Sequence, residues 1–200
     1  MPTGVHLRDA RQHLFDAAER VLLREGPHAL TSRAVTDEAG CAKGVLHRHF
    51  ADFDAFLTAL VLDRAAQLET QADALRRSAG TDTVAANLTG ALMTLFGPVP
   101  VAIIPLITFR DALRVRLREA LPRGGIAILA QATDAIRAYL TDERARGRIA
   151  ADADIDSLTL SLVGGGHLLF ADRDPGPPAA AVVGKFVTSV IAGVVPPGPA

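Results

Sequence analysis

Apolar residues recur at steps of three and four along most of this chain, and that period limits the fold more than any other feature. One stripe runs from Leu14 through Ala18 and Val21 to Leu22, and Gly26-Pro27 ends it. No segment alternates apolar and polar residues over the length of a strand between turn signals, and no internal repeat is present. The sequence therefore predicts an all-α protein.

Glycine, proline and capping residues divide this pattern into about nine helices. Thr31-Ser32 and Asp52 can cap the helices that follow them, and Gly40 is suited to a left-handed carboxyl cap. The segment Gly97-Pro98-Val99-Pro100 is expected to separate two helices. The expected helices lie at about 7–25, 32–39, 42–50, 53–77, 82–97, 103–120, 124–146, 154–171 and 178–194.

The composition allows a sizeable core, because 49% of the 200 residues are hydrophobic and 22% are charged. The one cysteine, Cys41, excludes an intrachain disulfide, and the charged amino-terminal segment does not resemble a signal peptide. The longest apolar stretch, residues 99–107, is interrupted by Pro100 and Pro105 and is shorter than the roughly 20 residues that span a bilayer. We therefore expect a cytoplasmic protein with no membrane partner.

The amino-terminal segment has three expected helices with a tight glycine turn between the second and third, which are the elements of a helix-turn-helix. Residues 14–50 resemble the DNA-binding domain of the TetR/AcrR family of transcriptional regulators. The positions that carry the resemblance are Ala17-Ala18, Gly26, Thr31, Ala39-Gly40 and His49-Phe50. The resemblance implies a DNA-binding domain over residues 1–52 and a larger helical domain over 53–200 that binds an effector and dimerises.

The resemblance also implies which exposed residues meet double-stranded DNA. The start of the second helix contacts phosphates, and the third helix contacts base edges and backbone. The expected contacts are Thr31, Ser32, Arg33, Ala42, Lys43, Gly44, His47 and Arg48. His47 stands where the family usually has a tyrosine, Ala42 where a serine is common and Phe53 where a lysine usually reaches the backbone. We therefore expect few phosphate contacts and a shallow dependence of affinity on salt.

The resemblance implies that the last two expected helices pair with the same helices of a second subunit. The sequence supports this independently, because Gly164-Gly165-Gly166 inside a helix cost about 1 kcal/mol each unless close packing compensates. Packing against the expected 124–146 helix of the same chain is the alternative. The expected interface residues are Leu158, Leu162, Gly165, Leu169, Phe186 and Val190.

An apolar cluster around the proline-interrupted turn is the expected place for a small-molecule effector. Its residues are Met93, Phe96, Ile103, Ile104, Phe109 and Arg110. Plain core is the alternative role for the apolar members. Arg110, Arg114 and Arg118 share one helical face, which is either a solvated surface or a seat for an anionic effector.

These features predict a ligand-released repressor that binds a pseudo-palindromic operator as a homodimer. The alternative is a helical small-molecule-binding protein with a weakened DNA-binding arm, since residues 1–50 carry seven Lys/Arg against six Asp/Glu. We find no enzyme motif, no metal-ligand spacing and no cofactor motif, so we expect no catalysis, metal or cofactor. Cys41 is either a small buried residue or a redox-active thiol beside a helix amino terminus.

Overall fold

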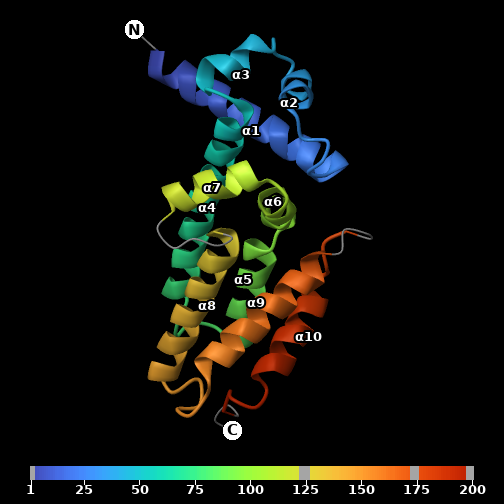
Figure 1. Cartoon of the computed structure of the whole chain (residues 1–200). Helices are drawn as coiled ribbons and strands as arrows, with labels where there is room; N and C mark the ends of the chain where they lie inside the picture. The colour runs from blue at the N-terminus through green and yellow to red at the C-terminus, as the bar shows by residue number, and fades with distance from the viewer. Residues whose placement is uncertain (1–2, 122–126, 172–175, 197–200) are drawn as a thin grey trace. The chain divides into compact units, whose positions relative to one another are not determined.

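The structure, a computed structural model, describes residues 3–121, 127–171 and 176–196. These residues form ten α-helices and no strand (Figure 1), which confirms the predicted all-α class. The chain divides into two compact units that are not continuous in sequence. The first unit comprises Met1–Arg64 and Ala102–Ile126, and the second comprises Ala65–Val101 and Ala127–Ala200. Two of the three boundaries between the units, at 64/65 and 101/102, fall inside helices α4 and α6.

The first unit holds the amino-terminal helices and a later segment of the chain. Its helices are α1 (Thr3–Glu25), α2 (Ser32–Glu38), α3 (Gly44–His49), the first half of α4 (Phe53–Arg77), most of α6 (Pro98–Thr108) and α7 (Asp111–Ala120). Phe15, Phe50 and Phe56 form an aromatic cluster in its core, with ring centroids 5.1 to 6.0 Å apart. Burial of each ring contributes about 1.5–3 kcal/mol, and the cluster joins α1, the end of α3 and α4.

Local hydrogen bonds fix the ends of the short helices as the sequence predicts. The hydroxyl of Thr31 accepts a hydrogen bond from the Ala34 amide at 3.1 Å, and the carboxylate of Asp52 accepts one from the Ala55 amide at 2.6 Å. Gly40 has φ +63°, the left-handed conformation that its carboxyl-cap position requires. The predicted caps of α2 and α4 are confirmed.

The second unit packs its helices closely through glycine. It contains the rest of α4, α5 (Val84–Leu95), α8 (Ala127–Ala145), α9 (Ile155–Ala171) and α10 (Ala180–Ile191). A Cβ on Gly165 would lie 2.6 Å from Phe186 Cε2, and one on Gly166 would lie 3.2 Å from side-chain carbons of Leu92 and Phe96. The close packing that these two glycines predict therefore occurs within the chain, against α10 and α5 rather than α8. A Cβ on Gly164 would meet open space.

A polar cluster in the second unit ties α8 to the turn between α4 and α5. Glu143 is fully buried, and its carboxylate accepts a hydrogen bond from the Gly80 amide at 3.0 Å and faces Arg148 at 3.3 Å. The Asn87 side chain donates to the hydroxyl of Tyr139 at 3.1 Å. Burial raises the pKa of Tyr139 well above its usual value. Because the partners are far apart in sequence, no local pattern marks this cluster.

The prediction of a single helix over 103–120 is wrong. The predicted separation of two helices near 97–100 is confirmed, but the break is shorter than expected, because α5 ends at Leu95 and α6 already begins at Pro98. Helix α6 begins at Pro98, and a separate helix, α7, follows after Arg110, so the described residues contain ten helices rather than about nine. Prolines are tolerated in a first turn because the first amides of a helix have no intrahelical partner. A second break, which the sequence analysis did not expect, comes at Arg110, whose backbone is extended (φ −120°, ψ 98°).

Within the described parts of the chain, no single helix is both long and apolar enough to cross a membrane. One bent pair, α5 with α6, meets the length and composition criteria when the two helices are taken together. The amino acids of this pair include the buried core residues Leu88, Leu92 and Ile103.

Candidate nucleic-acid interface

Helices α2 and α3 form a helix-turn-helix with a tight connection. The Cys41 amide donates to the carbonyl of Thr36 at 3.0 Å, and the Gly40 amide donates to that of Asp37 at 3.1 Å. On the inner side of α3, Leu46 is fully buried and Phe50 closes the helix. The opposite side of α3 is therefore free to face a ligand.

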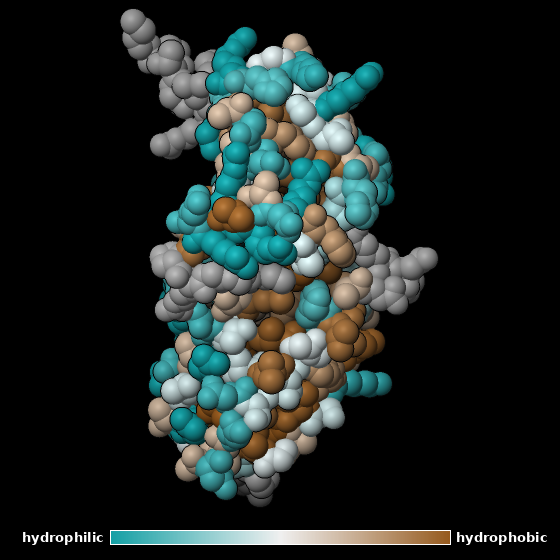
Figure 2. Space-filling view, in the orientation of Figure 1, coloured by the Kyte–Doolittle hydropathy of each residue, from teal (hydrophilic) through white to brown (hydrophobic). Residues whose placement is uncertain are grey.

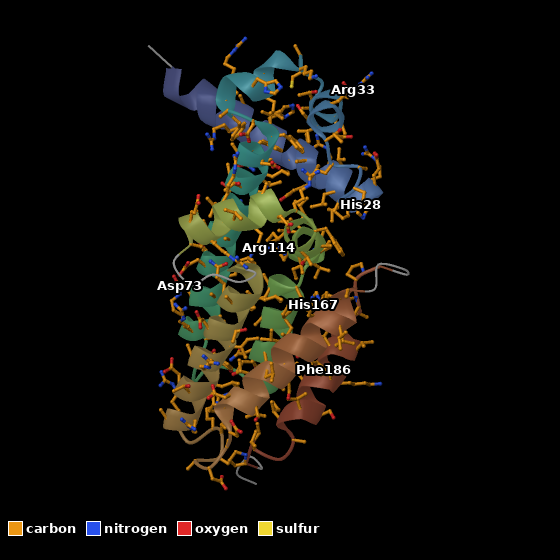
Figure 3. All side chains as sticks on the ribbon, viewed as in Figure 1. His28, Arg33, Asp73, Arg114, His167 and Phe186 are labelled. Carbon is orange, nitrogen blue, oxygen red and sulfur yellow. The ribbon has the colours of Figure 1, made fainter. Side chains whose placement is uncertain are left out.

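Most of the residues predicted to contact DNA are exposed, at the start of α2 and along α3. Thr31, Arg33, Ala42, Lys43, Gly44, His47 and Arg48 are all exposed, and Arg33 projects from α2 (Figure 3). Ser32 is half-buried, and its hydroxyl has no hydrogen-bond partner within the described part of the chain. A Cβ on Gly44 would have no atom within 4 Å, so nothing obstructs the surface at the start of α3.

The cations of the first unit differ in whether a carboxylate neutralises them. Arg20 and Arg24 both pair with Glu38, at 2.7 and 2.8 Å, and these hydrogen bonds lower the pKa of that carboxyl. Lys43 and Arg48 have no ion pair among the described residues. The nearly equal numbers of cations and carboxylates in residues 1–50 therefore conceal an uneven arrangement, in which the α3 surface keeps its positive charge.

Sequence analysis missed Arg11, a further cation next to α3. Its guanidinium lies 4.6 Å from the ring centroid of Phe50 and 5.9 Å from that of Phe15, and no carboxylate pairs with it among the residues that the structure describes. The four-residue spacing of Arg11 and Phe15 on α1 is a signal that could have placed it beside the aromatic cluster.

The thiol and the histidines near the turn do not form a metal site. Cys41 is half-buried, and burial raises the pKa of its thiol, which is the opposite of the change that makes a cysteine reactive. The imidazole of His13 lies 2.9 Å from the carbonyl oxygen of Ala39. No group of three or more histidine, cysteine, aspartate or glutamate residues in the described ranges could hold a metal ion.

Comparison with known proteins agrees with this geometry. Residues 14–60 match the sequence pattern of the family described as "Bacterial regulatory proteins, tetR family". The match covers about a quarter of the chain, so this amino-terminal part is similar to the TetR family. No curated protein sequence matches the chain.

Solved structures of transcriptional regulators share the fold of most of this chain. FadR of Bacillus subtilis in complex with stearoyl-CoA is 18% identical, with a TM-score of 0.67 over 91% of this chain and 98% of its own. The ketosteroid regulator KstR2 of Mycobacterium tuberculosis is 21% identical, with a TM-score of 0.65 over 94% of this chain and 95% of its own. NalD, the secondary repressor of the MexAB-OprM multidrug efflux pump in Pseudomonas aeruginosa, is 17% identical, with a TM-score of 0.63 over 94% and 96%.

The six residues predicted to bind the effector are divided between the two units. In the second unit, Met93 on α5 is half-buried, and Phe96, which follows the helix, is fully buried with its ring centroid 6.3 Å from those of Phe170 and His167. In the first unit, Ile103 and Ile104 are buried, Phe109 is 73% exposed and Arg110 is half-buried.

Arg110, Arg114 and Arg118, which the sequence analysis placed on one helical face as either a solvated surface or a seat for an anionic effector, differ in their partners. Arg110 bonds to the carbonyl of Leu30, and Arg114 bonds to Asp111 and to the carbonyl of Thr108. Arg118 is exposed and has no ion pair in the described ranges. Two of the three side chains are therefore engaged within the first unit.

The second unit contains a groove of about 280 Å³ between α4 and α5 that the sequence did not indicate. Its wall is made of small residues with a few polar ones: Gln71, Ala74, Leu75, Ser78, Ala86, Asn87, Gly90, Ala91, Thr94 and Leu95. Elsewhere in this unit the side-chain atoms Gln131 Oε1, Thr159 Oγ1 and His167 Nδ1 are buried without hydrogen-bond partners among the described residues.

The residues predicted at a dimer interface are mostly covered by their own chain. Leu162 is fully buried, and Leu158, Gly165, Leu169, Phe186 and Val190 are half-buried. The exposed apolar residues of the same two helices are Leu160, Leu168 and Val182, which the sequence analysis did not select. Helix α9 is apolar on nearly all sides, so its period does not show which face meets its own chain.

Proposed function

We propose that this protein is a transcriptional repressor that binds a pseudo-palindromic operator as a homodimer and releases it when a small molecule binds. In functional terms residues 1–52 would bind DNA, and residues 53–200 would bind the effector and form the dimer. The family and the solved neighbours are regulators, which supports a role in binding rather than catalysis. A bacterial regulator of this kind acts in the cytoplasm, where the chromosome lies.

The exposed surface of α3 is the observation that carries the proposal. Lys43 and Arg48 lie there without carboxylate partners in the described ranges, and Gly44 leaves room for close approach of the backbone. Thr31 and Arg33 extend the surface at the start of α2. Phosphates neutralise free cations at lower cost than paired ones, because no existing ion pair must be broken.

The proposed dimer rests on apolar side chains that reach the surface over α9 and α10 (Figure 2). Leu168 is 74% exposed and Leu160 73% exposed, and Gly164 on the same helix has open space in front of it. Pairing of these helices between two subunits would bury them. A dimer also supplies two copies of α3, which a pseudo-palindrome needs about 34 Å apart.

The proposed effector is a small molecule with apolar and polar parts that binds the second unit. Buried polar atoms without partners cost free energy, and a ligand that bonds to His167 Nδ1 or Gln131 Oε1 would recover it. FadR of Bacillus subtilis was solved with stearoyl-CoA, so a protein of this fold accommodates a ligand with apolar and polar parts.

The DNA-binding proposal is tested by fluorescence anisotropy on duplexes that the full-length protein selects from a random library and on the DNA flanking its own gene. Lys43→Glu is expected to lower the affinity about 10- to 100-fold, since a lost contact of this kind is worth about 1–3 kcal/mol. Arg77→Glu is the matched control, because Arg77 is exposed on α4 in the second unit and the change in net charge is the same. Equal affinity of wild type and Lys43→Glu would favour a helical small-molecule-binding protein with a weakened DNA arm.

The dimer is tested by sedimentation at several protein concentrations. Leu168→Glu is expected to shift the protein toward monomer, since it places a charge in an apolar interface. Leu23→Glu, at an exposed leucine on α1, is the control and should leave the dimer intact. A wild-type protein that remains monomeric at micromolar concentration would contradict this part of the proposal.

A further inference from the structure

Two arginines from one later segment of the chain hold both ends of the helix-turn-helix. Arg110 donates from Nη2 to the carbonyl of Leu30 at 3.1 Å, immediately before the cap of α2. Arg116 donates from its two terminal nitrogens to the two carboxylate oxygens of Asp52, at 2.9 and 2.8 Å. Asp52 follows Phe50, the residue that closes α3, by two positions. All of these residues belong to the first unit.

Arg110 is seated by three further groups at the start of α4. Its guanidinium lies 5.6 Å from the ring centroid of Phe53 and 3.6 Å from the carboxylate of Asp54. The Phe53 ring in turn stacks on Phe56, with centroids 5.6 Å apart and an interplanar angle of 21°. Phe53 thus provides an aromatic surface on which the Arg110 guanidinium rests.

The carboxylate of Asp52 both caps a helix and forms an ion pair. It accepts the hydrogen bond from the Ala55 amide that caps α4, and it receives both nitrogens of Arg116. Paired hydrogen bonds between guanidinium and carboxylate fix the orientation of the two groups as well as their distance. These hydrogen bonds also lower the pKa of Asp52, so the pair is charged at neutral pH.

The short helices of the motif depend on such contacts for their orientation. Helix α2 has seven residues and α3 has six, fewer than the roughly 12–15 that an isolated helix needs to be stable in water. Their position is therefore set by what they pack against and by where their ends are attached. The two arginines attach those ends to the same segment, residues 109–116.

We propose that Arg110 and Arg116 are positioning residues for DNA binding, which hold α3 in its binding orientation without touching DNA. This inference rests on the proposed DNA-binding function. Two other roles are possible for an exposed arginine: Arg116 could contact a phosphate itself, or the pair could only stabilise the fold. The three roles predict different combinations of affinity, salt dependence and thermal stability.

The experiment measures affinity for the selected duplex at several KCl concentrations for full-length wild type, Arg116→Ala, Asp52→Asn and the double variant. Asparagine retains the cap of α4 but loses the charge that binds Arg116. Each single variant is expected to bind about three- to tenfold more weakly, and the double variant no more weakly than either single one. The slope of log affinity against log salt should stay unchanged, since no phosphate contact is lost.

Two controls separate this effect from loss of charge and loss of stability. Arg118→Ala removes an exposed cation of the same helix and should leave affinity unchanged. Arg110→Lys keeps the charge but loses the planar group that reaches the Leu30 carbonyl and lies over Phe53, and it should weaken binding as Arg116→Ala does. Thermal unfolding of each variant shows that the protein is folded at the temperature of the assay.

Several outcomes would overturn the inference. A salt slope that falls by about 0.9 in Arg116→Ala, with Asp52→Asn unaffected, would make Arg116 a phosphate contact. Unchanged affinity in both single variants, with a lower melting temperature, would leave the pair a purely structural role. Wild-type protein that selects no duplex would overturn the proposed function and this inference together, whereas the first two outcomes overturn the inference alone.

Discussion

Different kinds of long-range contact stabilise the interior of each unit. In the first, arginines join distant segments: Arg64 on α4 is almost fully buried and pairs with Glu19, Asp16 and Asp63, and Arg116 pairs with Asp52. In the second, the closest contacts are between glycines and aromatic rings, as at Gly165 and Phe186. An ion pair restricts the relative orientation of its two side chains, and an exposed one contributes little to the free energy of unfolding. Close apolar packing restricts the volume of the side chains and contributes more. In the first unit, ion pairs therefore fix the orientation of helices, whereas in the second unit close packing fixes the distance between them.

Glu143 is a fully buried charged residue of the second unit, and its removal should have the largest effect. Glu143→Ala leaves the Gly80 amide and Arg148 without their buried partner, so the free energy of unfolding should fall by about 3–5 kcal/mol. Asp52→Asn, which breaks an exposed pair in the first unit, should lower it by less than about 1 kcal/mol. Urea denaturation followed by circular dichroism measures both. If the two variants lose similar amounts of unfolding free energy, buried and exposed ion pairs do not differ in their contribution to stability in this protein.

Gly165→Ala tests the volume constraint directly. The new methyl group would overlap the Phe186 ring, and we expect a loss of about 1–3 kcal/mol of unfolding free energy. The double variant with Phe186→Ala removes the ring and should recover the cost of the overlap, although it loses the burial of the ring. If Gly165→Ala is as stable as wild type in the same urea titration, the packing at this position is looser than the contacts indicate.

Alkaline pH should destabilise the second unit through Tyr139. Burial raises the pKa of the folded phenol, so the folded state is favoured below about pH 10, where the unfolded phenol begins to ionise. Above that pH the unfolding free energy should fall by up to about 1.4 kcal/mol per pH unit. Because the chain has one tyrosine and no tryptophan, absorbance at 295 nm reports this group alone. Phenolate absorbance near pH 10 with intact helical dichroism would contradict the assignment.

Gly164→Ala should have the smallest effect on the free energy of unfolding, and it should raise stability rather than lower it. Alanine is favoured over glycine in a helix by up to about 1 kcal/mol, and no atom lies within 4 Å of the added methyl group. Unfolding at low protein concentration should show this gain, and sedimentation shows whether the methyl group weakens the proposed dimer. A loss of stability in the monomer would mean that Gly164, like Gly165, packs against its own chain.

The helix-turn-helix was predictable because its determinants are local. A cap such as Thr31 acts on an amide three residues away, and Gly40 permits a backbone conformation that other residues disfavour. The predicted DNA contacts could be selected for the same reason, since exposure on a short helix follows from its apolar side. The body was less predictable, because α9 is apolar on both its inner and outer faces and its period indicates helix without orientation.

The sequence by itself determined the all-α class, the helix-turn-helix and the caps of α2 and α4, because each depends on residues within one or two turns of one another. Only the tertiary structure decided where α6 ends, which glycines of α9 meet their own chain, and which carboxylate receives Arg116. Asp52 and Arg116 are 64 positions apart. Such a pair is specified by the packing of the intervening chain, and no spacing in the sequence records it.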